Sequence, residues 1–547
     1  MFTSYFSSSN SPKNPSEEAS REYQVKILEK YGKIVNSLAA LDCQRGDMKR
    51  QLSSVVLAFI LASLFIASLR IERARAAGVI YIRSDGSVEP SDAPIQRNGS
   101  TYNLTGDISC SSDGIVIERD GAILNGAGYA LQGAGIGTGI NVSQQNNIAI
   151  MNLKIRSFHY GIWLSASSNN ALIGNSITDN FDGIDLWNSS NNNTIFQNNI
   201  TTNTGLGIGL SSSSNNNVSN NYLVAGLEDD IYLNNSSNNI ISGNTVLLSA
   251  WTGIGIFGSS KRNLIIGNEI ANNTMFNIRL YWSSENSIIR NNITDNVVGI
   301  QFDNSSTKNT VCGNNLTNNG YGIRFSSSCS ENVVLHNNLE NNTVHQIYTG
   351  YSANILDDGY PSGGNYWSDY NGTDVFAGSF QDETGNDGIG DSAHVLDAKN
   401  ADRYPLMGRF ETYYVGSWNE APCFVDITSN STVADFGFNA SQKCISFNVT
   451  GSSSEGFCRV TIDNALLGGP YTVQVNTTQL DFTTESNGTH SFIYFTYSQS
   501  TQKVWITGTS AIPEFPSAMI FQLLIVITLL AVAFCRRIIP KSKFSWG

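Results

Sequence analysis

The most regular feature of the chain is a pattern of apolar and polar positions that repeats with a fixed period. A step of the type Gly-Ile-x-Leu returns every 22 to 24 residues, from Gly139 and Gly161 through to Gln346. A column of asparagines runs in step with it, from Asn152 to Asn337. A locked period of this length is typical of a solenoid, in which each repeat packs only against its neighbours.

Each repeat contains short runs in which apolar residues alternate with polar ones, as in residues 183–187 and 194–200. This period of two predicts half-buried strands, and turns rich in Asn, Ser and Gly separate them. Such strands bury their apolar faces when the repeats stack in parallel, at about 4.8 Å per repeat. The pattern therefore predicts a parallel β-helix of about eleven coils.

Two columns of aliphatic residues should then point into the β-helix. They are Ile140, Ile162, Ile184, Ile208, Ile231, Ile254, Ile278, Ile300 and Ile323 in one stack, and Ile195, Val218, Ile241, Ile265, Ile288, Val311 and Val334 in the other. The Asn column falls where the chain should turn. Asn tolerates left-handed φ, and its amide can bond the equivalent amide of the next coil. We interpret this column as an architectural ladder and not as a ligand site.

The pattern changes after the repeats. Residues 411–511 contain short alternating segments such as 444–449 and 471–475, separated by turn signals, which predicts an antiparallel β-sandwich. Cys444 and Cys458 flank a predicted hairpin and are placed to form a disulfide. The other cysteines have no evident partner, and the absence of a CxxC pair argues against zinc.

An apolar run near the N-terminus, Val55–Leu69, follows Lys49 and Arg50 and precedes an Ala74-x-Ala76 site. This order predicts a secretory signal that ends near Ala77, and the alternative is an uncleaved signal anchor. Because a signal of ordinary length begins at Met48, we suspect that translation starts there.

A second apolar run, Ser517–Cys535, is long enough to cross a bilayer, and the basic residues behind it place the C-terminus inside. The preceding Pro513–Pro516 motif resembles the PEF type of archaeal sorting tail. That resemblance implies removal of the tail and attachment of a lipid, and the alternative is a plain membrane anchor. The predicted domains are 1–77 (leader), 78–350 (β-helix), 351–410 (cap), 411–511 (sandwich) and 512–547 (anchor or sorting segment).

Composition excludes some classes of function. Charged residues make up only 14% of the 547 residues, against about 25% in an average soluble domain, and the net charge is -13. No cluster of Lys and Arg is interleaved with aromatic residues in the body of the chain, so a nucleic-acid partner is not expected. Asn-x-Ser/Thr sequons recur from Asn98 to Asn487, which indicates a glycoprotein, although an Asn- and Ser-rich repeat also generates sequons by composition.

Outward positions of the repeats suggest a surface that contacts sugars. Aromatic rings offer flat apolar faces for sugar rings, and charged groups between them can bond hydroxyls. The predicted carbohydrate-binding residues are Trp163, Asp185, Trp187, Tyr232, Arg279, Tyr281, Asp303 and Arg324. Ordinary surface is the competing interpretation.

Catalytic carboxylates are harder to assign. Asp185 and Asp303 stand about 24 Å apart at the expected coil spacing, too far for a glycosidase pair. Asp182 with Asp185, or Asp229 with Asp230, lie closer, but their side chains should alternate in direction along a strand. The sequence therefore predicts no catalytic set.

One segment carries residues suited to a metal ion. Asp382, Asn386, Asp387 and Asp391 place hard oxygen ligands among glycines, which suits Ca²⁺. The alternative is a solvated capping turn. Histidines and methionines are scattered, so no copper site is expected from the residues.

Residues 78–410 resemble the NosD-like right-handed β-helix proteins of archaeal and bacterial surfaces. The resemblance is carried by the first coil, 115–128, and by the exit motifs 363–370, 387–391 and 404–407. It implies fold and location more firmly than activity, because the group spans carbohydrate-binding and sugar-hydrolysing β-helices and a periplasmic factor linked to copper enzyme maturation.

The sequence thus predicts an all-β protein: a right-handed parallel β-helix followed by a β-sandwich, with terminal hydrophobic helices. We expect a secreted, C-terminally anchored protein on the outer face of the cell membrane that binds glycans or neighbouring surface proteins. The alternatives are a polysaccharide lyase or glycoside hydrolase, and a surface spacer without a ligand.

Overall fold

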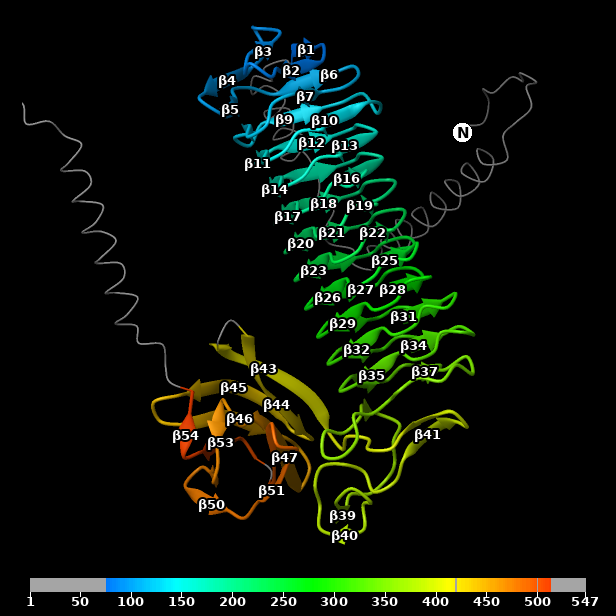
Figure 1. Ribbon diagram of the computed structural model, residues 1–547, viewed down its shortest axis with the longest axis vertical. Helices are drawn as coiled ribbons and strands as arrows, with labels where there is room; N and C mark the ends of the chain where they lie inside the picture. The colour runs from blue at the N-terminus through cyan, green and yellow to red at the C-terminus, as the bar shows by residue number, and fades with distance from the viewer. Residues whose placement is uncertain (1–74, 419–420, 499, 513–547) are drawn as a thin grey trace, which may run out of the picture. The chain divides into compact units, whose positions relative to one another are not determined.

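The structure is a computed structural model that describes residues 75–418, 421–498 and 500–512. All regular secondary structure within these ranges is β-strand (Figure 1). Across the same ranges no helix is long and apolar enough to span a membrane. The predicted signal segment Val55–Leu69 and the predicted C-terminal helix Ser517–Cys535 lie outside the described residues.

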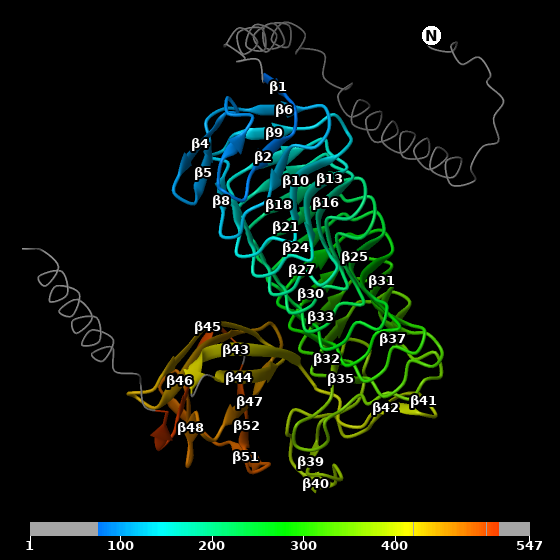
Figure 2. The ribbon, with the colours of Figure 1, turned by 45° about the horizontal axis from the view of Figure 1, so that its top comes forward.

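Residues 75–367 form a right-handed parallel β-helix of about eleven turns, as the repeat predicts. Three long sheets, named A, B and C, run along it, and the chain passes through each sheet once per coil (Figures 1 and 2). Neighbouring coils pair in parallel, except that β3 pairs antiparallel with β2 and β4 with β5 near the N-terminal end.

Sheet A consists of β1 (Arg75–Ala77), β6 (Ile108–Cys110), β9 (Ala130–Gln132), β12 (Lys154–Arg156), β15 (Ser176–Thr178), β18 (Asn199–Thr201), β21 (Tyr222–Val224), β24 (Thr245–Leu247), β27 (Glu269–Ala271), β30 (Asn292–Thr294), β33 (Asn315–Thr317), β36 (Asn338–Glu340) and β38 (Tyr366–Trp367). Sheet B consists of β3 (Val88–Glu89), β2 (Ile80–Ile82), β7 (Ile115–Ile117), β10 (Thr138–Ser143), β13 (Tyr160–Ser165), β16 (Asp182–Trp187), β19 (Ile208–Ser211), β22 (Ile231–Asn234), β25 (Thr252–Phe257), β28 (Phe276–Tyr281), β31 (Val298–Asp303), β34 (Tyr321–Phe325) and β37 (His345–Tyr348). Sheet C consists of β4 (Ile95–Asn98), β5 (Thr101–Leu104), β8 (Ile123–Asn125), β11 (Ala149–Met151), β14 (Ala171–Ile173), β17 (Thr194–Phe196), β20 (Asn217–Ser219), β23 (Ile240–Ser242), β26 (Leu264–Ile266), β29 (Ser287–Ile289), β32 (Thr310–Cys312) and β35 (Val333–Leu335).

The interior of the β-helix is filled by stacked aliphatic side chains. Both predicted stacks are confirmed, because their members are buried and pair in register from coil to coil. Ile231, for example, is fully buried between Ile208 and Ile254. A third stack comes from sheet A, where Leu223 pairs with Ile200 and Val246. Stacking is thus what buries the apolar face that one coil cannot bury alone.

The asparagine column is confirmed as a structural ladder. The side-chain Oδ1 of Asn244 accepts hydrogen bonds from the backbone N (2.9 Å) and the Nδ2 (3.0 Å) of Asn221 in the preceding coil. The Nδ2 of Asn221 also donates to the carbonyl of Ile195 at 2.9 Å. A second column flanks the other side of sheet C in the same way, with Asn216 bonded to Asn239. Backbone groups that the turns leave unpaired are therefore satisfied inside the molecule.

Two details of the predicted ladder are wrong. Asn152 is exposed and lies one residue before the ladder position, which Leu153 occupies, since the backbone N of Leu153 donates to Asn175. The left-handed conformation also belongs to the residue before each ladder Asn. These residues are Gly174, Gln197, Asn220, Gly243, Gly267, Arg290, Gly313 and His336. The Asn itself is needed for its amide and not for its backbone freedom.

The last coil is closed by the exit segment. The ladder continues from Asn337 to Asn365, and the backbone N of Asn365 donates to the buried carboxyl of Asp402 at 2.8 Å. The indole of Trp367 donates to the same carboxyl at 2.7 Å. Two short hairpins follow the coil, β39 (Phe376–Ala377) with β40 (Glu383–Thr384) and β41 (His394–Asp397) with β42 (Asn400–Asp402). The family-like exit motif therefore supplies the partners that the end of the ladder needs.

Residues 409–511 form two five-stranded antiparallel sheets whose inner side chains share one hydrophobic core. The first sheet contains β43 (Arg409–Trp418), β44 (Ala421–Ser429), β47 (Glu455–Asp463), β52 (His490–Ser498) and β51 (Thr483–Ser486). The second contains β45 (Thr432–Asn439), β46 (Cys444–Thr450), β53 (Gln502–Thr507), β49 (Thr472–Val475) and β50 (Thr478–Leu480), and β48 (Leu467–Gly468) pairs with β54 (Ser510–Ala511).

The predicted hairpin between Cys444 and Cys458 is wrong. The two residues lie on β46 and β47, which belong to different sheets, and both thiols are free. Cys458 is buried, where its Sγ lies 3.6 Å from the hydroxyl of Ser429. Burial raises the pKa of the Cys458 thiol to about 12.

Replacing Ile231 by Asp tests the register of the core. The substitution places an unpaired carboxyl in a dry aliphatic stack, which costs several kcal/mol. We expect Ile231→Asp to lower the melting temperature of the full-length protein by more than about 10 °C, or to prevent folding. The matched control is Ile240→Asp, because Ile240 is 43% exposed on sheet C. Equal melting temperatures for the two variants would contradict the register.

Candidate functional site

The outward face of sheet B carries the predicted carbohydrate-binding residues in two columns. The strand register confirms this alignment. The first column runs Trp163, Asp185, Gly209, Tyr232, Gly255, Arg279, Gln301 and Arg324. The second pairs Ser165 with Trp187 and, further along, Asn234 with Phe257, Tyr281 and Asp303.

Aromatic rings on this face form two groups. In the first, Trp163 and Trp187 stack with ring centroids 5.7 Å apart, and Tyr160 lies 4.6 Å from Trp163. In the second, the ring of Phe257 lies between those of Tyr232 (5.1 Å) and Tyr281 (6.1 Å). Trp187 is 42% exposed, so its ring offers surface to solvent.

The second aromatic group adjoins a polar network. The guanidinium of Arg279 binds the carboxylate of Asp303 at 3.0 Å, and the same carboxylate accepts bonds from Gln301 (2.9 Å) and Ser326 (2.6 Å). Arg324 is exposed at the end of the column. The structure therefore brings Arg279, Tyr281 and Asp303 together, and Asp303 is fully occupied by protein partners.

Asp185 differs from its predicted place on the exposed strip, because it is only 3% exposed and its carboxyl hydrogen-bonds to that of Asp182. The expected alternation is broken between them. Ile184 is fully buried, and a Cβ on Gly183 would also point inward, to 3.0 Å from Ile200. Two consecutive inward residues leave Asp182 and Asp185 on the same outward side. The prediction that these side chains alternate in direction is therefore wrong.

More carboxyls lie close to this pair. Asp229 occupies the column of Asp182 two coils further on, about 9.6 Å along the axis. It is 5% exposed, and its Oδ1 has no hydrogen-bond partner among the described residues. Glu228 precedes it and is exposed. Reasoning from sequence dismissed Asp182 and Asp229 and overlooked Glu228; the signal that identifies the pair is Asp-Gly-Ile-Asp at 182–185.

Burial dominates the electrostatics of this acidic cluster, which we define as Asp182, Asp185, Glu228 and Asp229. Burial raises the pKa of Asp182, and burial followed by repulsion from Asp182 raises that of Asp185 well above its ordinary value. Burial raises the pKa of Asp229 to about 7, with a further contribution from Glu228. The cluster thus holds protons at a pH where ordinary carboxyls have lost them.

Glycines next to the cluster make room for the carboxyls. A Cβ on Gly209 would lie 2.1 Å from an oxygen of Asp185, and one on Gly255 would lie 2.5 Å from an oxygen of Asp229. Real contacts of this kind do not occur, so a larger residue at either position must displace the acid. The absence of side chains at Gly209 and Gly255 therefore leaves the space that the carboxyls of Asp185 and Asp229 occupy.

Two of the predicted calcium ligands accept hydrogen bonds from backbone amides. Asp391 accepts hydrogen bonds from the backbone N of Val375 and Phe376, and Asp387 accepts one from Ile389. Asp382 and Asn386 are exposed. Within residues 75–418, 421–498 and 500–512, no group of three or more His, Cys, Asp or Glu is placed to hold a metal ion. Hydrogen bonds of this kind are typical of a capping turn, and the calcium site stays a prediction.

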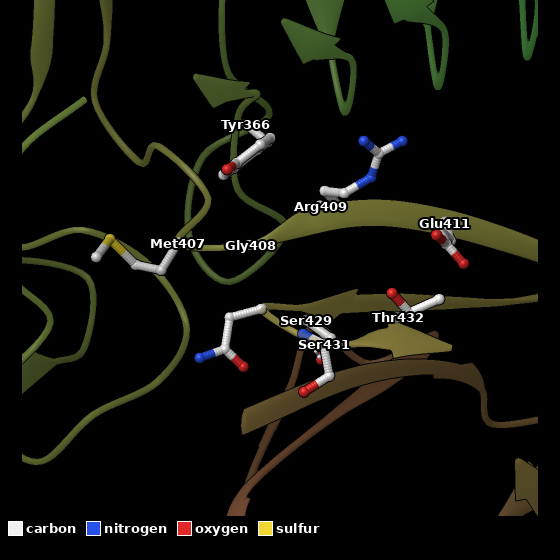
Figure 3. Close-up of a pocket in the computed structure, with 9 residues that line it drawn as sticks. Tyr366, Met407, Gly408, Arg409, Glu411, Ser429, Ser431 and Thr432 are labelled. Carbon is white, nitrogen blue, oxygen red and sulfur yellow. Dashed lines mark hydrogen bonds between the residues drawn. The ribbon is translucent and has the colours of Figure 1, made fainter. Parts of the chain in front are cut away.

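A hollow of about 420 Å³ lies beside β43 (Figure 3). Tyr366, Arg409 and Glu411 line it together with Ser429 and Thr432. Arg409, its only basic lining group, is bound to Glu340 at 2.7 Å. Because Arg409 is already paired, it is not available to bind a ligand in this hollow. The face of sheet B carries more aromatic and polar side chains that could contact a ligand.

The fold places this protein among the right-handed parallel β-helix proteins. Two overlapping segments, residues 104–278 and 230–372, match the model of the family described as NosD, periplasmic copper-binding protein. The β-helical region of the chain is therefore NosD-like. Among the described residues, no three His, Cys, Asp or Glu side chains are grouped to hold a metal ion such as copper.

Solved structures with a similar fold include the tailspike protein gp208 of Dettilon, at 13% identity and a TM-score of 0.40 over 79% of this chain and 85% of that one. The A-module of the Azotobacter vinelandii mannuronan C-5 epimerase AlgE4 shares 13% identity, with a TM-score of 0.32 over 49% and 89%. The periplasmic alginate epimerase AlgG shares 14%, with a TM-score of 0.33 over 51% and 82%. These are likenesses of fold alone. No curated protein matches the chain.

The raised pKa of Asp229 predicts a pH-dependent stability. Below about pH 4 the carboxyl is protonated in both the folded and unfolded states, whereas between about pH 4 and 7 only the folded state keeps the proton, so the folded state loses stability as pH rises through this window. We expect Asp229→Asn to melt several degrees above the parent at pH 8, corresponding to about 1–3 kcal/mol, and to match it at pH 4.

The control for this measurement is Glu269→Gln, which removes an exposed carboxyl from sheet A. Its melting temperature should follow that of the parent at both values of pH. A loss of stability in Asp229→Asn that is greater at pH 8 than at pH 4 would show that the carboxylate is ionised and partnered.

Proposed function

We propose that this protein is a secreted, membrane-anchored cell-surface protein that binds carbohydrate along the outward face of sheet B. The observation that carries the proposal is the register of this sheet, which aligns two groups of half-exposed aromatic rings with polar groups between them. Aromatic faces pack on the apolar faces of sugar rings, and carboxyl, amide and guanidinium groups bond hydroxyls.

The dimensions of the face suit an extended glycan. Trp187 and Tyr281 lie four coils apart, or about 19 Å at the spacing of neighbouring strands. Their strands, β16 and β28, belong to the same continuous sheet, so the rings are held by the packed core below them. A sugar chain that follows the axis can therefore contact both aromatic groups without a change in the fold.

The edge of sheet B adds apolar surface to the proposed site. Exposed side chains occupy one turn position in several coils, and hydrogen bonds between backbones connect them, as from Met275 to Trp251. The exposed residues at this position are Phe181, Trp251, Met275, Val297 and Val344. A row of this kind can pack against one side of a glycan or against a neighbouring surface protein.

The remaining parts of the chain complete the proposal. The leader of residues 1–77 directs secretion, and residues 512–547 anchor the chain or act as its sorting tail. Between them, the cap at 351–410 closes the β-helix at 78–350, and the two antiparallel sheets of 411–511 act as a β-sandwich stalk. Sequons on the outside of the cell carry glycans. The sequence patterns at the two ends support this placement.

Removing two outward-facing rings tests carbohydrate binding. Each stacking ring contributes about 1–3 kcal/mol to a complex, so Trp187→Ala with Tyr281→Ala should abolish measurable binding on a glycan array. The melting temperature should change little, because both rings lie outside the core. Tyr222→Ala, which removes an exposed ring from sheet A, is the matched control and should bind like the parent.

The same experiment separates the alternatives. Undiminished binding by the double variant would show that the strip is ordinary surface, and absence of any binding by the parent would favour a structural spacer. Release of reducing ends from a bound glycan would instead make the protein a glycoside hydrolase.

Secretion predicts a mature N-terminus near Ala77. Cleavage after the Ala74-x-Ala76 site removes the apolar segment 55–69 together with everything before it. N-terminal sequencing of the native protein should therefore begin at or next to Ala77. A mature chain that retains residues 1–47 would contradict both the cleavage and a start at Met48.

A further inference from the structure

The acidic cluster has few positive groups near it. His159 lies beside Asp182, and Arg279 lies near Asp229, but the guanidinium of Arg279 is bound to Asp303. None of the ion pairs among the described residues involves an acid of the cluster. Burying several carboxyls without a cation is costly, so the free protein holds a site that a positive charge would stabilise.

One buried acceptor atom of the cluster, and another further along the same face, lack a hydrogen-bond donor. The Oδ1 of Asp229 and the Oε1 of Gln301 have no hydrogen-bond partner among the described residues, and Gln301 is only 1% exposed. Buried acceptors without a donor are rare in folded proteins and cost free energy. Gln301 is neutral and lies three coils beyond Asp229, where its amide nitrogen donates to Asp303, so the unpaired oxygen that belongs to the acidic cluster is that of Asp229.

Aromatic rings flank the cluster on both sides. Tyr160 and Trp163 lie in the coil before the Asp182–Asp185 pair, and Tyr232 follows Gly209 in the same column. The ring of Phe257 packs against that of Tyr232. The faces of such rings attract cations, most strongly where water is excluded. Carboxyls and ring faces thus surround the same few coils.

We propose that this part of sheet B selects glycans that carry free amino groups, of the deacetylated hexosamine type, over neutral and anionic glycans. This inference rests on the proposed function and names its ligand class. An ammonium group donates three hydrogen bonds and brings the charge that the cluster lacks. The cluster offers no cation to the acidic groups of uronic acids.

Affinity should depend on pH in two directions. The groups that face the site are Asp182, Asp185, Glu228, Asp229, His159, Tyr160, Tyr232 and Arg279. At low pH the carboxyls are protonated and lose their attraction for an ammonium group. At high pH the amine of the sugar loses its proton. Binding of a protonated amine near neutral pH should therefore expel protons from the cluster, because a cation lowers the pKa of neighbouring carboxyls.

The test uses the full-length protein in detergent and three probes: the hexamers of glucosamine and N-acetylglucosamine, and a hexamer of galacturonic acid. Calorimetry at pH 6 should give at least about tenfold tighter binding of the glucosamine hexamer than of the acetylated one. Titration in two buffers of different ionisation enthalpy should show release of protons with the glucosamine hexamer and none with the acetylated one.

Two isosteric variants then locate the selectivity. Asp185→Asn and Asp229→Asn should each reduce the preference for the amine to less than about threefold, while affinity for the acetylated hexamer stays within about threefold of the parent. Glu269→Gln on sheet A should keep the parent's preference. Melting at pH 6 checks that each variant is folded, and the proton release of the parent tests the inference even if a variant does not fold.

The outcomes separate this inference from the proposed function. Equal or tighter binding of the acetylated or galacturonic hexamer would overturn the inference and leave carbohydrate binding intact. A preference for the amine that survives in both Asn variants would overturn the assignment to the acidic cluster. Failure of the parent to bind any of the three hexamers would overturn the proposed function together with the inference that rests on it.

Discussion

The fold depends on hydrogen bonds that run along the axis between asparagine side chains. A solenoid must turn several times in each coil, and every turn removes backbone groups from the sheets. The side-chain amides of Asn221 and Asn244 satisfy these unpaired backbone groups. Each amide bonds to the backbone of a neighbouring coil as well as to the next amide in the ladder. The buried amides therefore connect the coils at positions where strands cannot. The last rung, Asn365, needs Asp402 for the same reason.

The period-two pattern and the fixed repeat predicted the parallel β-helix, its inward stacks and the role of the Asn ladder, since these follow from burial and spacing alone. The register of the outward columns followed as well. Which side chains of a single strand face inward and which face outward was harder to predict. Gly183 and Ile184 both face inward, so Asp182 and Asp185 share a side, which strict alternation forbids. The pairing of strands in the C-terminal sheets could not be predicted from the sequence either. Cys444 and Cys458 were expected to flank a hairpin but lie on separate sheets.

The acidic cluster shows how function and stability oppose each other on a packed scaffold. Carboxyls that lie against glycines gain a fixed position, and they lose contact with water. The core beneath them is supported by stacks on all three sheets, so it tolerates this cost locally. Nearby, the carboxylate of Asp303 is paired with Arg279. The acidic cluster lacks a cation that a bound molecule could supply, whereas the Arg279–Asp303 region already contains one.

The ladders also limit how such a protein can change length during evolution. Coils with an extra residue hold it in a turn. Asn180 bonds to Asn203, which is 23 residues later, whereas Asp182 bonds to Leu206, which is 24 residues later, so the turn between them contains one additional residue. Gly258 and Ser259, both left-handed, absorb another between Phe257 and Ser260. Insertions elsewhere would shift every column above them at once. The chain should therefore gain or lose residues in whole coils. Related chains should differ in the number of coils, while each column of residues keeps its position on the surface of the β-helix.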